Sequence, residues 1–252
     1  MSADPRIAPA FAAAHGYDAH ARVQQRVAVG LADRIAALPL PPAPRVLEIG
    51  CGTGFLTAAL QDRGLGGPWL VTDLAAPMVE RCRARLGQRA DTRFAVLDGE
   101  HGPRPAEAPF DLICASLAFQ WFTDLPTAVA GLRGWLAPGG HLVFTTLAEG
   151  TFAEWQAAHH AEGLSAGTLP LPNRAALASL SRATPLAIAP HRETHADARS
   201  FLRSVKAIGA GTPHRHHRPL SPAALRRVMA RFDEAGAVAT YVVATCHDRR
   251  EP

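Results

Sequence analysis

The chain has 252 residues, of which 48% are hydrophobic and 19% charged, and its formal net charge at pH 7 is +4. This length suits one large domain, and the composition is ordinary for a globular protein. We expect no membrane association, because no apolar run reaches the ~20 residues of a membrane-spanning helix and the N-terminus lacks the apolar segment of a secretory signal.

Cysteine spacing and charge distribution narrow the function classes further. The four cysteines are widely separated and form no C-x-x-C pair, which favours a reduced, cytoplasmic protein without structural zinc. The excess of arginine is spread over many segments, with no basic stripe interleaved with aromatic residues, so no nucleic-acid partner is expected. A solvated basic surface or a docking face for an acidic protein explains the charge equally well.

Residues 1–40 have apolar side chains at near-helical intervals and predict an N-terminal helical segment. Tyr17 lies in this segment, either as a core residue with a hydrated hydroxyl or as a ligand contact. Four prolines between positions 39 and 44 then end the helix and lead the chain to a first strand.

The stretch from Arg45 to Leu60 reads R-V-L-E-I-G-C-G-T-G-F-L-T-A-A-L and predicts a buried strand, a glycine turn and a helix. Such a turn brings the backbone close to a ligand and directs the N-terminus of the helix at it. A dinucleotide fingerprint would need glycine where Phe55 stands, and the G-K-[ST] of a P-loop is missing. The E-x-G-x-G-x-G pattern resembles the first motif of class I S-adenosylmethionine-dependent methyltransferases, with a plain tight turn or another nucleotide as alternatives.

Acidic residues follow the next two predicted strands. The strand 69–73 ends in Asp73, 23 residues after Gly50, where a doubly wound fold places a carboxylate on ribose hydroxyls. The strand 94–97 precedes Asp98, which could accept a hydrogen bond from an adenine amino group. The alternatives are a helix N-cap for Asp73 and an Asp-Gly turn for Asp98. The helix 77–86 between these strands carries three arginines that we expect on a solvated face.

The remaining core continues the alternation of strands and helices. Strands are predicted at 110–116 and 141–146, with a helix at 126–136 between them, which indicates a parallel sheet covered by helices on both faces. Ligands bind at the carboxyl end of such a sheet, so the aromatic stretch 117–122 belongs to the expected site.

After residue 150 the pattern is less regular. We expect a helix at 152–160 with His159 and His160 on its surface, a strand near 186–194, an amphipathic helix at 197–210, a basic loop at 211–219, a helix at 221–232 and a last strand at 238–246. The predicted fold is a doubly wound, mostly parallel seven-stranded α/β sheet of one structural domain. It divides into an N-terminal helical cap (1–44), a cofactor-binding core (45–150) and a C-terminal part (151–252) with a helical lid at about 197–218.

Four segments together resemble the malonyl-[acyl-carrier-protein] O-methyltransferases of biotin synthesis. They are A-F-A-A-A-H-G-Y-D-A-H-A-R-V-Q at 10–24, the stretch from Phe110 to Pro126, L-A-P-G-G-H-L-V-F-T-T-L at 136–147, and F-L-R-S-V-K-A-I-G-A at 201–210. The resemblance implies methylation of the free carboxylate of a malonyl thioester, which disguises it as a primer for elongation toward pimelate. The loop 211–219 and the stretch 161–200 depart from the pattern.

The resemblance also implies a set of site residues. S-adenosylmethionine would be bound, and released as S-adenosylhomocysteine, by Tyr17, Glu48, Gly50, Cys51, Gly52, Gly54, Asp73, Leu74, Met78, Asp98, Gly99, Ser116 and Leu117. Gln120 and Trp121 would position the substrate, and Arg203, before Lys206, would hold its carboxylate. No general base is expected, because a carboxylate with a pKa of about 4 is already ionised at pH 7. No metal is expected.

Two other functions fit the same motifs. The nearest is methylation of a free acid such as trans-aconitate, and the other is a protein that binds the cofactor without catalysis. For the malonyl function the expected partner is an acidic acyl-carrier protein, or coenzyme A in its place, and the expected oligomeric state is a monomer.

Overall fold

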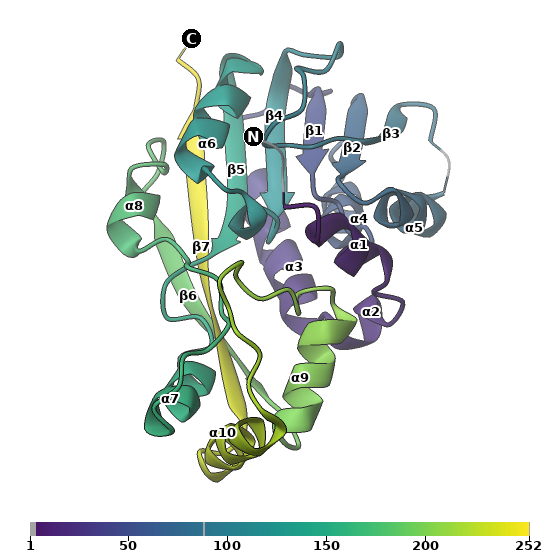
Figure 1. The fold of residues 1–252 in the computed structure, drawn as a ribbon. Coiled ribbons are helices and arrows are strands. Elements are labelled where there is room, and N and C mark those ends of the chain that lie inside the picture. Colours follow the sequence, from purple (N-terminus) through teal and green to yellow (C-terminus); the bar gives the residue numbers. More distant parts are fainter. Residues whose placement is uncertain (1–3, 88, 252) are drawn as a thin grey trace.

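The computed structural model describes residues 4–87 and 89–251, in which seven strands form one sheet of order β3-β2-β1-β4-β5-β7-β6 (Figure 1). Strand β7 runs antiparallel between β5 and β6, whereas β1 to β5 pair in parallel. The mostly parallel seven-stranded sheet predicted from the sequence is therefore confirmed. The strands are β1 (Val46–Ile49), β2 (Trp69–Asp73), β3 (Thr92–Val96), β4 (Phe110–Ser116), β5 (Leu136–Leu147), β6 (Ala187–Thr194) and β7 (Val238–Arg249).

Helices cover both faces of the sheet because its central strands are apolar on both sides. On one face Val46 and Leu112 pack with the helices α3 and α4, and on the other Leu47 and Ile113 pack with α6. The helices are α1 (Ile7–Ala12), α2 (Tyr17–His20), α3 (Arg22–Ala36), α4 (Phe55–Asp62), α5 (Ala76–Leu86), η1 (Phe119–Trp121), α6 (Leu125–Gly134), α7 (Ala153–Ala161), α8 (Arg174–Ala178), α9 (Ala198–Ala207) and α10 (Pro222–Glu234).

The segment 1–40, predicted to be helical, contains three separate helices, and residues 1–3 of it lie outside the described residues. The chain leaves helical geometry between α1 and α2, and again at Ala21, whose ψ is 40°. These breaks let α1 and α2 turn back over the carboxyl ends of β1 and β2 instead of continuing the axis of α3 (Figure 1).

Beyond the carboxyl end of the sheet, α7, α9 and α10 form a separate layer that we call the lid (Figure 1). An aromatic cluster holds these helices together: the ring centroids of Trp155, Phe201 and Phe232 lie 5.1–5.5 Å apart. Helix α9 begins at an N-cap aspartate, Asp197, whose side chain accepts from the Ser200 backbone N–H. It ends at Ala207, earlier than the predicted residue 210, and the following loop leads to α10.

Polar groups are also buried at the opposite end of the sheet. Asp248 is 1% exposed, and its carboxylate accepts hydrogen bonds from Arg182 at 2.7 and 3.1 Å. Beside it, His141 Nδ1 and His247 Nε2 lie 2.9 Å apart in a buried pair. Burial lowers the pKa of both imidazoles, that of His141 to about 4. This pair ties β5 to β7 without a charge.

Within the described residues, every helix is too short or too polar to traverse a lipid bilayer. The four cysteines are buried and free, as the sequence predicted for a protein without disulfides.

Candidate active site

Three glycines in left-handed conformation shape the loop between β1 and α4. The φ angles of Gly50, Gly52 and Gly54 are +71°, +54° and +90°, a region that favours glycine. A Cβ at Gly50 would lie 2.5 Å from that of Ala118, so the loop also approaches the end of β4 too closely for any side chain. The glycines therefore serve both the sharp turn and the close approach.

Asp73 joins the end of β2 to this loop. Its two carboxylate oxygens accept the backbone N–H groups of Gly52 at 2.9 Å and Ala75 at 2.8 Å. Burial raises the pKa of Asp73, and these N–H donors oppose that effect. Each oxygen retains a second lone pair, so the carboxylate can accept two further hydroxyl donors, such as those of a ribose.

A cavity of about 90 Å³, here named the glycine-loop cavity, lies between this loop and α1. It brings together ten of the residues expected from the sequence: Tyr17, Gly50, Gly52, Asp73, Leu74, Asp98, Gly99, Ser116, Leu117 and Trp121. Ala118 and Phe122, from the expected stretch 117–122, also line it, and sequence reasoning missed seven others: Ile7, Ala8, Phe11, Ile49, Ala75, Leu97 and Glu100. Those from α1 had no signal in the sequence, since an amphipathic helix does not indicate where it folds back.

Asp98 forms the turn that was one of its two alternatives, and it also lines the cavity, while its contact with an adenine stays a prediction. Its Oδ1 accepts the backbone N–H groups of Glu100 at 2.9 Å and His101 at 3.0 Å. A Cβ at Gly99 would lie 2.5 Å from Ile49 Cγ2, which leaves room there for glycine alone.

Four of the expected cofactor residues lie outside the glycine-loop cavity: Glu48, Cys51, Gly54 and Met78. Glu48 is 1% exposed and accepts a hydrogen bond of 2.7 Å from the hydroxyl of Thr57 on α4. Burial raises the pKa of its carboxyl group. Glu48 thus supports the loop from behind.

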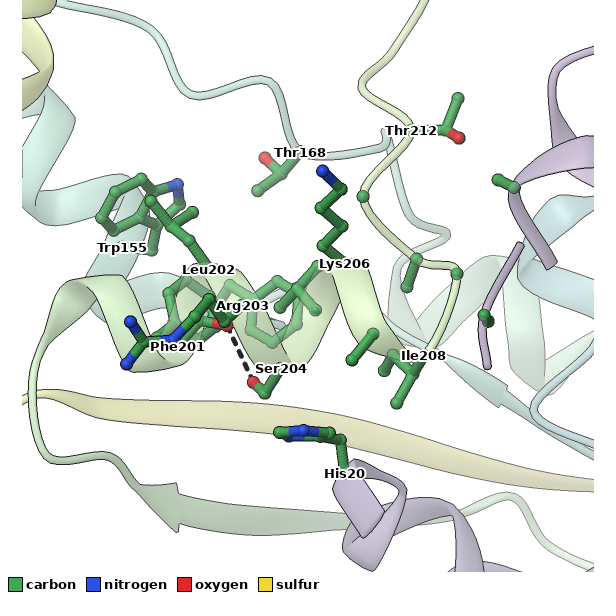
Figure 2. Close-up of a pocket in the computed structure, with 18 of the residues that line it drawn as sticks. His20, Trp155, Thr168, Phe201, Leu202, Arg203, Ser204, Lys206, Ile208 and Thr212 are labelled. Carbon is green, nitrogen blue, oxygen red and sulfur yellow. Dashed lines mark hydrogen bonds between the residues drawn. The ribbon is translucent and has the colours of Figure 1, made fainter. Parts of the chain in front are cut away.

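A second, larger cavity of about 1440 Å³ lies between the lid and the carboxyl end of the sheet, and we call it the lid cavity (Figure 2). Phe11, Tyr17, Leu117 and Trp121 line both cavities and form their common border. Leu117 has a φ of +49°, which is uncommon for a branched side chain, and its N–H donates to Thr145 Oγ1 at 3.0 Å. Strained backbone of this kind gathers at functional sites.

Gln120 lines the lid cavity, and the structure fixes its orientation. Its Nε2 donates to the Leu117 carbonyl at 2.6 Å, so Oε1 must be the remaining acceptor. That oxygen is buried, with no hydrogen-bond partner in the described part of the chain. An amide oxygen accepts hydrogen bonds and repels a carboxylate, so it suits an ammonium or other donor group.

The charged side chains that line the lid cavity are mostly cationic. The lining includes the cations Arg22, Arg203 and Lys206 and, among the described residues, a single carboxylate, that of Glu193. Among the described residues Lys206 has no acidic partner within 4 Å, and in Figure 2 its side chain extends across the cavity toward the segment of Thr168. Arg203 instead donates to Ser200 Oγ at 2.9 Å, toward the start of α9. Both cations line the cavity, and the expected order, Arg203 before Lys206 as the anion anchor, stays a prediction.

The histidines near the lid are structural. His159, expected on the surface, is 3% exposed, and its Nδ1 lies 2.8 Å from the Trp155 carbonyl oxygen. In the basic loop 211–219, the ring of His217 packs against Gly167, where a Cβ would lie 2.9 Å away. Across residues 4–87 and 89–251, no three His, Cys, Asp or Glu side chains gather as a metal site would require.

Comparison with known proteins shows which family the sequence matches. Residues 46–140, which contain the glycine loop, match the family described as "Methyltransferase domain". The malonyl-[acyl-carrier protein] O-methyltransferase of Magnetococcus marinus is 41% identical over 94% of this chain and 90% of its own length. The biotin biosynthesis bifunctional protein BioCD of Bordetella avium is 45% identical over 94% of this chain, which spans about half (51%) of that longer protein.

Solved structures share the fold at low sequence identity. The YcgJ protein of Bacillus subtilis superposes with a TM-score of 0.57 at 17% identity, covering 89% of this chain and 98% of its own. Phosphoethanolamine N-methyltransferase 2 of Haemonchus contortus, solved with S-adenosyl-L-methionine, gives 0.55 at 16% identity, over 96% of this chain and 57% of its own.

Proposed function

This chain belongs to the malonyl-[acyl-carrier protein] O-methyltransferase family, and on that premise we propose that it methylates the free carboxylate of a malonyl thioester, with S-adenosylmethionine as donor. The glycine-loop cavity would hold the donor and the lid cavity the thioester. The observation that carries the assignment of the acceptor is the unpaired Lys206 in the lid cavity.

The residues present fit this cofactor. Gly50, Gly52 and Gly99 present backbone without a side chain to the cavity, and Asp73 retains acceptor capacity for the two hydroxyls of a ribose. Tyr17 closes the cavity from α2, and burial raises the pKa of its phenol, which keeps it uncharged. The unpartnered Gln120 Oε1 at the border would accept from the ammonium of the methionine end.

Catalysis would depend on positioning and exclusion of water. When bound, the cofactor supplies an electrophilic methyl group; a carboxylate oxygen bonds to its carbon as the carbon–sulfur bond breaks, leaving the electron pair on sulfur. Leu117 and Trp121 form the wall where the two cavities meet and would hold the reacting groups in line. Lys206 would bind the carboxylate, and no proton needs to be removed.

The size of the lid cavity supports a long substrate. About 1440 Å³ exceeds the ~300–1,000 Å³ of typical small-ligand sites and leaves space for the arm that carries the malonyl group. Exposed cations at its rim, Arg22 and Arg203, would favour an acidic carrier protein over a neutral partner. We propose the carrier protein as the physiological partner, acting with a monomer of this chain in the cytoplasm.

The direct test is transfer of labelled methyl from S-adenosylmethionine to malonyl-carrier protein, malonyl-coenzyme A and trans-aconitate in parallel. We expect the malonyl thioesters to be preferred, with a KM for the carrier protein that rises with salt concentration. Transfer to trans-aconitate alone would keep the cofactor site and refute the proposed acceptor. Cofactor binding without transfer to any of the three would contradict the assignment of the substrate.

Lys206→Met should lower kcat/KM for the malonyl thioester about 30-fold, since losing a cation from a carboxylate costs about 2 kcal/mol. Methionine keeps the length and apolar stem of lysine, so the change isolates the charge. The matched variant Arg203→Met, on the same helix, should change kcat/KM less than about threefold, that is under ~0.7 kcal/mol. Steady-state kinetics measure the effect of each variant on kcat/KM for the thioester. Calorimetry measures cofactor affinity, which neither variant should alter. A larger loss in Arg203→Met would identify Arg203 as the anchor instead.

A further inference from the structure

The N-terminal cap, which we define as residues 4–21, forms the outer wall of the glycine-loop cavity. Ile7, Ala8, Phe11 and Tyr17 contribute this wall, whereas the other lining residues come from positions 49–122 of the core. Ala14 of the cap also packs against Ala75 and Met78 at the start of α5. The cap is therefore a part of the cavity wall that lies outside the sheet.

The cavity is small for the proposed cofactor. About 90 Å³ is well below the ~300 Å³ at which small-ligand sites begin, and S-adenosylmethionine is a nucleoside with an amino-acid tail. The floor is held by the parallel pairing of β1 with β2 and β4. Outward movement of the cap, which lies outside the sheet, would admit the cofactor, and its return would close the site, as lids do in other enzymes.

One contact ties the cap directly to the glycine loop. Asp18, the neighbour of Tyr17, accepts a 2.6 Å hydrogen bond at Oδ1 from the hydroxyl of Thr53, which stands between Gly52 and Gly54. Its Oδ2 pairs with Arg85 of α5, whose guanidinium carbon lies 4.7 Å from the centroid of the Phe55 ring. Sequence reasoning did not single out Asp18.

A second contact joins the cap to α5, one helical turn before Arg85. Arg81 Nη1 donates to the Ala14 carbonyl at 2.7 Å, and Nη2 donates to the Ala12 carbonyl at 3.1 Å. Arg83 lies between Arg81 and Arg85 in the sequence of α5. It forms an ion pair with Glu80 instead, and its guanidinium lies over the Phe94 ring. The expectation that this arginine face of α5 is solvated holds for the exposed Arg85, whereas Arg81 is half-buried against the cap.

We propose that Asp18 is a positioning residue that latches the cap closed over the bound cofactor. This rests on the proposed cofactor function. Asp18 and Thr53 line neither cavity, so the latch acts through Tyr17 and the glycine loop without touching the ligand. Thr53 belongs to the loop that would hold the cofactor. When the bound cofactor orders this loop, the loop presents the Thr53 hydroxyl to Asp18, so closure of the cap and binding of the cofactor stabilise each other.

The test measures binding and release of S-adenosylmethionine by wild type, Asp18→Asn, Thr53→Val and Arg85→Met. We expect each variant to weaken binding about fivefold, mainly through faster dissociation, because the latch is half exposed and each contact contributes modestly. Arg83→Met is the matched control and should bind and release the cofactor as the wild type does. Unfolding midpoints of the free proteins should stay unchanged.

Two further measurements make the inference refutable. In the double variant Asp18→Ala/Thr53→Val, affinity should fall no further than in Asp18→Ala, because Asp18→Ala already removes the acceptor of the Thr53 hydroxyl; full additivity would overturn the latch. Hydrogen exchange in residues 7–20 should slow on cofactor binding in the wild type and less in Asp18→Asn. A wild type that fails to bind the cofactor would refute the proposed function itself, whereas normal wild-type binding with unchanged affinity and release in Asp18→Asn would refute the latch alone.

Discussion

Asp73→Ala is expected to raise the dissociation constant for S-adenosylmethionine about 100-fold, equivalent to about 3 kcal/mol. Two losses combine in this variant. The ribose hydroxyls would lose their acceptor, and the N–H groups of Gly52 and Ala75, now 2.9 and 2.8 Å from the carboxylate, would lose theirs. The glycine loop would then be free to leave the geometry that the cofactor needs. Calorimetric titration of the cofactor measures the effect.

The controls for this prediction separate charge, acceptor and fold. Asp73→Asn keeps an acceptor oxygen and should lose about tenfold in affinity, an intermediate result. Asp62→Ala removes an exposed carboxylate at the end of α4 and should leave affinity unchanged. If Asp73→Ala folds, as judged by its unfolding midpoint, and binds the cofactor as tightly as the wild type, then Asp73 does not hold the ribose.

Acidification from pH 7 to pH 4 is expected to remove about 3 kcal/mol of stability through the His141–His247 pair. The folded-state pKa of His141 is about 4 against an ordinary 6.5, and each pH unit between them corresponds to 1.36 kcal/mol. Burial, the second imidazole and nearby Arg249 all disfavour the charged form. Protonation of both imidazoles would also place two N–H groups face to face across the 2.9 Å contact.

The sign of this effect follows from proton uptake. Above pH 6.5 the imidazole is neutral in both states and contributes nothing to the pH dependence. Between pH 6.5 and 4 the unfolded chain binds a proton that the folded chain does not, so stability falls as the pH falls. Denaturant unfolding as a function of pH should therefore give a shallower profile for His141→Gln than for the wild type. His216→Gln, in the exposed basic loop, should keep the wild-type slope, and equal slopes in all three proteins would contradict the assignment.

The sheet and the glycine loop were predictable because their signals are local. The bounds of β2 and β4 coincide with those expected, since each is an apolar run between turn residues. Gly50 and Asp73 follow from spacing alone, because the carboxyl ends of adjacent parallel strands meet at one edge of the sheet. The malonyl methyltransferase family was recognised from the segments around residues 10–24, 110–126 and 201–210.

The cap and the lid could not be predicted because their placement depends on contacts far apart in the sequence. Arg81 binds the carbonyl of Ala14, 67 residues away, and the sequence around α5 gives no sign of it. The choice between Arg203 and Lys206 has a similar origin: both lie on the polar side of α9, and the lid cavity that both line is formed by several other segments. Short helices such as α8 have too few residues to show a period.

The position of β7 sets an order for synthesis on the ribosome. All residues that line the glycine-loop cavity precede residue 123, whereas the lid cavity needs Tyr241, and β6 is joined to the sheet through β7 alone among the described strands. A growing chain can thus complete the glycine-loop cavity while β5 still has an unpaired edge. Such an edge is a template for pairing with a strand of another chain. Translation that stops before residue 238 would leave a product with the first half of the site, an open edge on β5 and β6 without a neighbour.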